Sequence, residues 1–160
     1  MGGSPDARGW RVLPHWLVAP LVKIQRKLES FVFRGTPEES LEAAEELLRR
    51  QIRIFGPDGG PSAVGRANVA KKLEDLGRLD EARLLRREVV AGYKRHLGDE
   101  HIYTLSAELA LGINLKNSGM SDEARDLFTH VHEERTRLLG PDDEATLTAS
   151  RWLTSMDYGD

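Results

Sequence analysis

The feature that most constrains this chain of 160 residues is an internal repeat with a fixed interval. A glycine followed closely by an acidic residue occurs at Gly56, Gly98 and Gly140, and the interval is 42 residues each time (98 − 56 and 140 − 98). Gly77 and Gly119 are separated by the same interval. Self-similarity at such a period indicates a solenoid of stacked supersecondary units, because a single unit cannot bury its own apolar face.

Other positions keep the interval and point to helices. The string Asp-Glu-Ala-Arg occurs at 80–83 and again at 122–125, and apolar residues between the glycines follow helical spacing. Small residues fall where two helices would pack closely, at Ala70, Gly112, Ala82 and Ala124. The pattern predicts seven helices, at residues 20–34, 36–55, 61–76, 80–96, 103–118, 121–138 and 143–156.

The predicted helices form three hairpins and one closing helix. The repeats are expected at about 20–56, 57–98 and 99–140 and the closing helix at 143–157, whereas residues 1–19 form an N-terminal segment that is partly disordered or packs on the first repeat. Gly77 and Gly119 are expected to take the left-handed conformation, with Asp80 and Ser121 as the next N-caps. Residues 121–123 also fit the opening of an acid-rich first turn.

Composition excludes several classes of function. The chain has no cysteine, which excludes disulfides, thiolate catalysis and cysteine-ligated metal sites. The longest apolar run, 12–24, is interrupted by prolines and a lysine and is too short to span a bilayer. The net charge of −3 does not favour nucleic acid. The basic residues between 66 and 95 are interpreted as a solvated convex face, because Tyr93 is the one aromatic residue among them. A cytoplasmic protein, probably of bacterial origin in the usage of its repeats, is thus expected to bind neither nucleic acid nor membrane.

No cluster of residues meets the requirements of catalysis or metal binding. His130 and His132 are two residues apart on a helix and point about 200° from each other, so they cannot share a face. His130 with Glu133 or Glu134 supplies two ligands at most. These histidines are therefore predicted to be solvated surface residues, and His101 is predicted to cap a helix. We expect no enzyme activity, metal or cofactor.

Several of these motifs together carry a family resemblance. They are the small residues Ala70 and Gly112, the turn glycines Gly77 and Gly119, and the junctions Leu-Gly-Asp-Glu-His at 97–101 and Leu-Gly-Pro-Asp at 139–142, each followed by Thr-Leu. The pattern resembles the tetratricopeptide repeat in the 42-residue form of kinesin-light-chain-like arrays and bacterial regulatory proteins. The resemblance covers residues 20–157. It implies an all-α, right-handed superhelical solenoid of three helix–turn–helix repeats plus a closing helix.

The resemblance also implies a function, since members of the family bind peptides or protein segments in a concave groove lined by the first helices. An asparagine in that groove often holds the backbone of the ligand. Asn68 fits this asparagine, whereas the equivalent positions hold Ala110 and Trp152, and Asn114 lies one turn away. The expected groove is lined by Val64, Asn68, Lys71, Asp75, Leu109, Ile113, Lys116, Asn117, Arg151 and Trp152. The resemblance thus predicts a scaffold or adaptor that binds another protein or peptide.

Large apolar residues at both ends of the chain support an alternative function. These residues are Trp10, Trp16, Leu153 and Met156, together with Trp152. Either the N-terminal segment folds back over the first hairpin, or these side chains contact another chain or a second copy. The alternative is therefore a structural subunit that forms homo-oligomers through its aromatic ends.

Overall fold

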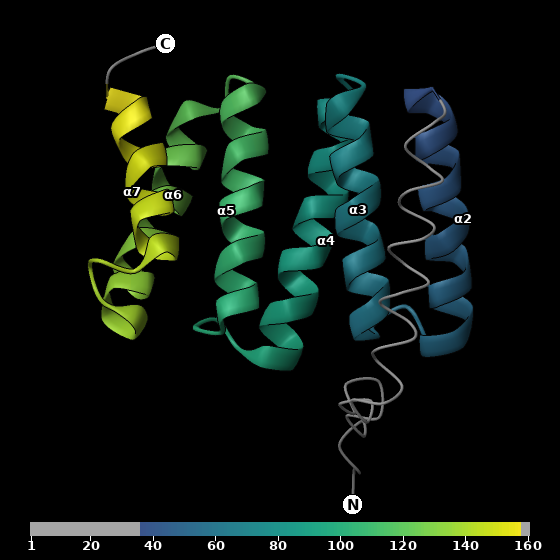
Figure 1. Cartoon of the computed structure of the whole chain (residues 1–160), viewed down its shortest axis with the longest axis horizontal. Helices are drawn as coiled ribbons and strands as arrows, with labels where there is room; N and C mark the ends of the chain where they lie inside the picture. Colours follow the sequence, from purple (N-terminus) through teal and green to yellow (C-terminus); the bar gives the residue numbers. More distant parts are fainter. Residues whose placement is uncertain (1–35, 158–160) are drawn as a thin grey trace, which may run out of the picture. The chain divides into compact units, whose positions relative to one another are not determined.

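The computed structural model describes residues 36–157, and every secondary-structure element in that range is an α-helix. The helices are α2 (Pro37–Phe55), α3 (Gly60–Asp75), α4 (Leu79–Leu97), α5 (Ile102–Asn117), α6 (Ser121–Leu139) and α7 (Glu144–Asp157) (Figure 1). The predicted all-α class is confirmed. The expected helix at 20–34 and the N-terminal segment at 1–19 lie outside the described residues.

The chain divides into two compact units, the first ending at Leu76 and the second beginning at Gly77. In the first unit α2 packs against α3. Thr36 and Glu39 form a capping box at the start of α2, and Pro37 occupies the first turn. Gly65 of α3 faces α2 so closely that a Cβ there would collide with the side chains of Leu48 and Gln51. Glycine at this position therefore lets the two helices approach each other.

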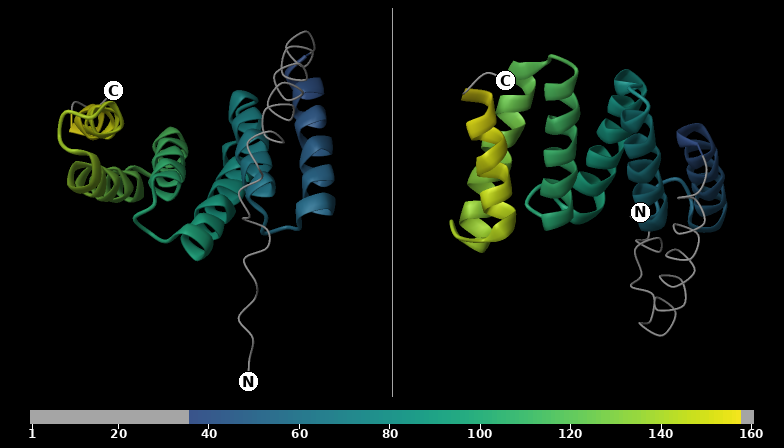
Figure 2. Two further views of the ribbon diagram at one scale, coloured as in Figure 1. Left: turned by 60° about the horizontal axis from the view of Figure 1, so that its bottom comes forward. Right: turned by 45° about the horizontal axis from the view of Figure 1, so that its top comes forward.

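In the second unit each helix packs against the next, so α5 lies between α4 and α6, and α6 also packs against α7 (Figure 2). Phe128 of α6 is fully buried, and its ring fits against Gly112 of α5, where an added Cβ would lie 2.6 Å from Phe128 Cε1. The small residues predicted at Gly112 and Ala124 are both buried, as close helix packing requires. The core of the unit consists of Leu105, Leu109, Leu111, Leu115, Ala124, Phe128, Val131 and Ala149.

The helix bounds repeat at the sequence interval. α3 and α5 are both 16 residues long and begin at 60 and 102, and α4 and α6 are both 19 residues long and begin at 79 and 121. A recurring hydrogen bond marks each junction: Ser62 Oγ donates to the carbonyl of Gly56 at 2.6 Å, and Thr104 Oγ1 donates to the carbonyl of Gly98 at 2.7 Å. The aligned hydroxyl residues thus tie the start of a helix to the end of the one before it.

The predicted N-caps at Asp80 and Ser121 are wrong. The helices begin earlier, with Arg78 and Met120 as N-caps that make no side-chain capping bond. Gly77 and Gly119 do have positive φ, of 74° and 78°, and the chain enters the helix directly after them. The carboxylates then lie inside the first turn, where they act on the positive end of the helix dipole rather than as caps. The alternative of an acid-rich first turn after Met120 is confirmed.

Candidate functional site

Four of the predicted groove residues lie along one exposed strip of α3 in the first unit. Val64, Asn68, Lys71 and Asp75 are spaced three or four residues apart and all are exposed, whereas Ala63, Val69, Ala70 and Leu73 are buried. Lys71 forms an ion pair with Asp75 one turn further along the helix. The strip is therefore polar and accessible, and its two charges neutralise each other.

The other six predicted groove residues lie on α5 and α7 in the second unit, and we call them together the α5–α7 face. The face is defined by Leu109, Ile113, Lys116, Asn117, Arg151 and Trp152. Lys116 of α5 joins the two helices, because its Nζ donates to Ser155 Oγ of α7 at 3.1 Å. The same Nζ lies 5.4 Å from the centre of the Trp152 ring, within the range of a cation–π interaction.

Trp152 connects the α5–α7 face to the core. Its ring stacks on the buried ring of Phe128, with centroids 5.8 Å apart and planes inclined by 21°. Trp152 itself is half-buried, so one part of the indole belongs to the core and another remains at the surface beside Lys116. The position of the Lys116 ammonium thus depends on how the α6 core residue is seated.

The remaining members of the α5–α7 face differ in accessibility. Leu109 is only 9% exposed and belongs to the core, and Ile113 is half-buried. Asn117 and Arg151 are exposed, and Arg151 pairs with Glu144 of its own helix at 3.0 Å. The accessible part of the face therefore consists of Ile113, Lys116, Asn117 and Trp152, with Arg151 at its edge.

Asn114 is not a substitute for the asparagine that would hold a ligand backbone. The side chain is fully buried, and its Nδ2 donates to the carbonyl of Leu79 at 3.2 Å. Because Leu79 begins α4, this bond links α5 to α4. Asn114 therefore has a structural role, and Asn68 is the one predicted backbone-holding asparagine that is accessible.

The residues predicted to make end contacts fall into two groups. Trp10 and Trp16 lie outside the described residues. Leu153 and Met156 of α7 are half-buried and pack against the core of the second unit. Their apolar surface is therefore partly used within the chain itself.

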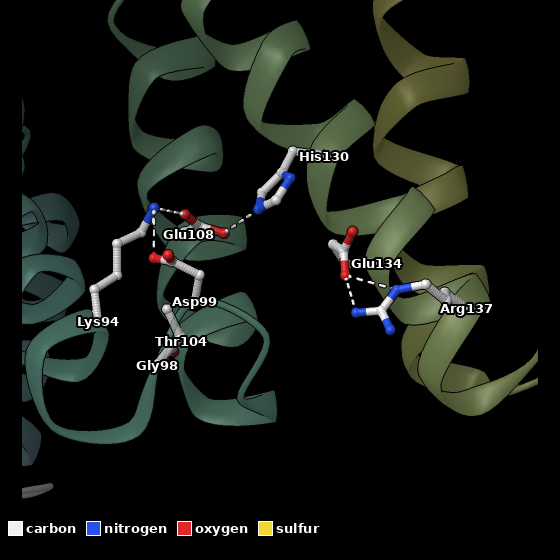
Figure 3. Close-up of polar contacts among 8 residues, drawn as sticks. All are labelled: Lys94, Gly98, Asp99, Thr104, Glu108, His130, Glu134 and Arg137. Carbon is white, nitrogen blue, oxygen red and sulfur yellow. Dashed lines mark hydrogen bonds and ion pairs between the residues drawn. The ribbon is translucent and has the colours of Figure 1, made fainter.

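A buried polar cluster on α5 was missed by the sequence analysis (Figure 3). Glu108 is only 1% exposed, and its Oε1 lies 2.7 Å from Lys94 Nζ of α4 while its Oε2 lies 3.4 Å from His130 Nε2 of α6. The pKa of Lys94 is raised, chiefly by its hydrogen bond to Glu108. The prediction that His130 is merely a solvated surface residue is thus wrong. The signal in the sequence was that Glu108 is the single charged residue between 102 and 115.

His101 lies where the sequence predicted it. It is the N-cap of α5, and its Nδ1 accepts a hydrogen bond from the Tyr103 N–H at 3.2 Å. Between residues 36 and 157 no three histidine or acidic side chains come together in a way that could hold a metal ion. Over the same range, every helix is too short or too polar to cross a membrane.

With this geometry established, comparison with known proteins identifies the repeat. The family model described as tetratricopeptide repeat matches residues 66–103, from the middle of α3 through α4 to the start of α5. The chain carries tetratricopeptide repeats. The resemblance seen in the junction motifs is therefore confirmed. No curated protein matches the sequence of the chain.

Solved structures share the fold of these repeats. Two crystal structures, one of them of a single-residue variant, show the nearly identical TPR-like repeats of a Podosopora anserina chain described in relation to kinesin light chain. Each superimposes with a TM-score of 0.75 at 20% sequence identity. The match covers 86% of this chain but only 65% of the length of the other, so it shows a shared fold over part of the solved chain.

Proposed function

We propose that the chain is a protein–protein interaction module, a scaffold or adaptor, that receives a peptide or helix of a partner on the α5–α7 face. The observation that carries the proposal is Lys116, whose ammonium is held in place by Ser155 and Trp152. Among the described residues Lys116 has no carboxylate partner, so its remaining N–H donors can bind acceptors of another chain.

The neighbours of Lys116 suit a bound backbone. Asn117 is exposed next to it and offers both an amide donor and an acceptor, while half-buried Ile113 offers apolar contact. The contrast with α3 supports the choice of surface, because Lys71 is already neutralised by Asp75. We propose Val64, Asn68, Lys71 and Asp75 as contact residues of the first unit, with weaker electrostatic attraction for a partner.

The test begins with peptides selected from a displayed random library against the full chain. Selected peptides are then titrated against wild type and against Lys116→Ala, with fluorescence polarisation as the readout. We expect Lys116→Ala to raise Kd about 10-fold or more, which corresponds to about 1.4 kcal/mol of binding free energy. Asn117→Ala, which makes no recorded contact within its own chain, is expected to act in the same direction.

Arg87→Ala is the matched control. Arg87 also loses a positive charge when replaced, but it lies on α4, where it pairs with Glu123 of α6 at 3.1 Å. A thermal melt of each variant verifies that it is folded. Equal affinities for Lys116→Ala and Arg87→Ala, or an unchanged Kd in Lys116→Ala, would show that the α5–α7 face is not the binding surface.

The alternative, self-assembly through aromatic ends, has no comparable observation in its favour. Leu153 and Met156 pack against the core of their own unit, and the two N-terminal tryptophans lie outside the described residues. Location in the cytoplasm and the absence of nucleic-acid and membrane partners remain predictions from the sequence.

A further inference from the structure

The two oxygens of the buried Glu108 carboxylate are treated differently by their surroundings (Figure 3). Oε1 receives the Lys94 ammonium at 2.7 Å, a normal charge-assisted hydrogen bond. Oε2 is buried and accepts no hydrogen bond. The nearest donor atom is His130 Nε2, but 3.4 Å is longer than the usual 2.7–3.2 Å of an N–H···O bond.

An unsatisfied buried carboxylate oxygen destabilises the packing around it, because the oxygen has lost its water without gaining a partner. His130 can supply that partner in one charge state better than in the other. A neutral imidazole has one N–H and one bare nitrogen, whereas a protonated imidazole donates from both nitrogens and adds a positive charge. Imidazoles undergo this change between about pH 5 and 8.

We propose that Glu108 and His130 form a pH-sensitive latch that tightens the contact between α5 and α6 when His130 gains a proton. The protonated ring closes on Glu108 Oε2 and completes the coordination that Lys94 begins. The half-exposed position of His130, whose side chain is 43% exposed, gives protons access to the ring while Glu108 stays buried.

The other charged groups around the latch agree with this direction. From α4 comes Lys94, and from the connection to α5 comes Asp99, 3.5 Å from the Lys94 ammonium. On α6 itself Glu134 lies one turn from His130 and is paired with Arg137 at 2.6 Å. Within residues 36–157 no ion pair joins His130 to α7. Lys94, Asp99 and Glu108 together carry one positive and two negative charges, so a protonated His130 balances them.

The test compares the melting temperature of the full chain with that of His130→Gln at pH 8.0 and at pH 5.5. Glutamine keeps a hydrogen-bond donor but cannot gain a charge. We expect the advantage of wild type over His130→Gln to be larger at pH 5.5 than at pH 8.0, by about 2–4 °C. His132→Gln is the control, since His132 lies on the same helix two residues away and its side chain makes no recorded ion pair.

Two further measurements keep the proposal open to refutation. In the Glu108→Gln background, the effect of His130→Gln is expected to become the same at both pH values. Should Glu108→Gln fail to fold, the imidazole N–H spectrum of the wild-type chain at pH 5.5 gives the same information. A slowly exchanging Nε2 proton is expected for His130 and not for His132. A wild-type advantage that is equal at both pH values, or an equal response in His132→Gln, overturns the latch.

Discussion

Two glycines in the middle of helices allow the packing of the second unit to be tested by one substitution each. Gly112 of α5 faces the ring of Phe128, and an added Cβ would lie 2.6 Å from Cε1, 3.0 Å from Cδ1 and 3.3 Å from Cζ. Gly92 of α4 has no atom within 4 Å of the corresponding position. Replacing each with alanine changes the helix propensity in the same way but the packing in only one case.

The expected magnitudes follow from these distances. Glycine to alanine inside a helix stabilises by about 0.5–1 kcal/mol, because alanine has less backbone entropy to lose. Gly92→Ala should show this gain in full. In Gly112→Ala the gain is opposed by overpacking, which typically costs about 1–3 kcal/mol. Phe128 is fully buried, so its ring has no free space into which it can move. We therefore expect a net loss of about 0.5–2 kcal/mol.

Urea denaturation followed by circular dichroism measures both changes on the same scale, and thermal melts provide a second readout. In a chain of this length, 1 kcal/mol corresponds to about 2–4 °C in Tm. Gly92→Ala should therefore melt a few degrees higher than wild type and Gly112→Ala a few degrees lower. Gly112→Ala with Phe128→Leu should recover part of the loss, since the smaller side chain makes room for the methyl group. Equal stabilisation by both alanines would refute the close contact between Gly112 and Phe128.

Three further predictions concern polar groups. Thr104→Val removes the hydrogen bond to the Gly98 carbonyl and should cost about 0.5–1.5 kcal/mol in urea denaturation, whereas Thr146→Val should be neutral or stabilising, because the buried Thr146 hydroxyl has no partner among the described residues. Equal losses in both would contradict the junction bond. Lys94→Met leaves the Glu108 carboxylate without its ammonium and should destabilise by about 1–3 kcal/mol, less than for a fully buried pair because the lysine side chain is 40% exposed; an unchanged urea midpoint would refute the pairing. Burial, and to a lesser degree Tyr103, raise the pKa of Tyr93, so the stability this tyrosine contributes is present below about pH 10 and lost as the pH rises through its folded pKa. Melts at pH 9 and 11 should show a smaller alkaline loss in Tyr93→Phe than in wild type, and equal losses would contradict the shift.

The sequence predicted the helices well because the period is set by residues whose roles are local. Glycine with positive φ ends a helix wherever it occurs, so Gly77 and Gly119 place the turns without knowledge of the fold. The predicted start of α5, at 103, differs by one residue from the observed Ile102. The N-caps were wrong because the string Asp-Glu-Ala-Arg fits both a cap and a first turn, and only the backbone hydrogen bonds distinguish the two.

The polar contacts of the candidate site could not be predicted in the same way. Glu108 meets Lys94 and His130, which lie on two other helices, and the contacts depend on how those helices pack. The burial of Asn114 depends similarly on α4, whose Leu79 carbonyl it satisfies. The repeat register indicated which residues share a face of α5 or α7. It did not indicate that Trp152 would stack on Phe128 and hold Lys116.

The same register explains why α7 is a poor surface for adding another helix. The α7 residues one interval after Gly112 and Leu115 are Thr154 and Asp157, and both are exposed. Thr154 places a branched side chain where α5 needs glycine to receive Phe128. Asp157 is paired with Arg125 of α6 and therefore stays on its own unit.

One apolar residue on this side of α7 could still mediate contact between copies. Leu147 corresponds to the fully buried Leu105 but is 38% exposed. A single exposed leucine beside polar residues buries too little area for a stable interface. Light scattering over a range of concentrations is expected to give the same mass for wild type and Leu147→Lys. A larger mass in wild type that disappears in Leu147→Lys would show that the polar replacements on α7 do not prevent stacking, and would restore self-assembly as the better explanation of this end of the chain.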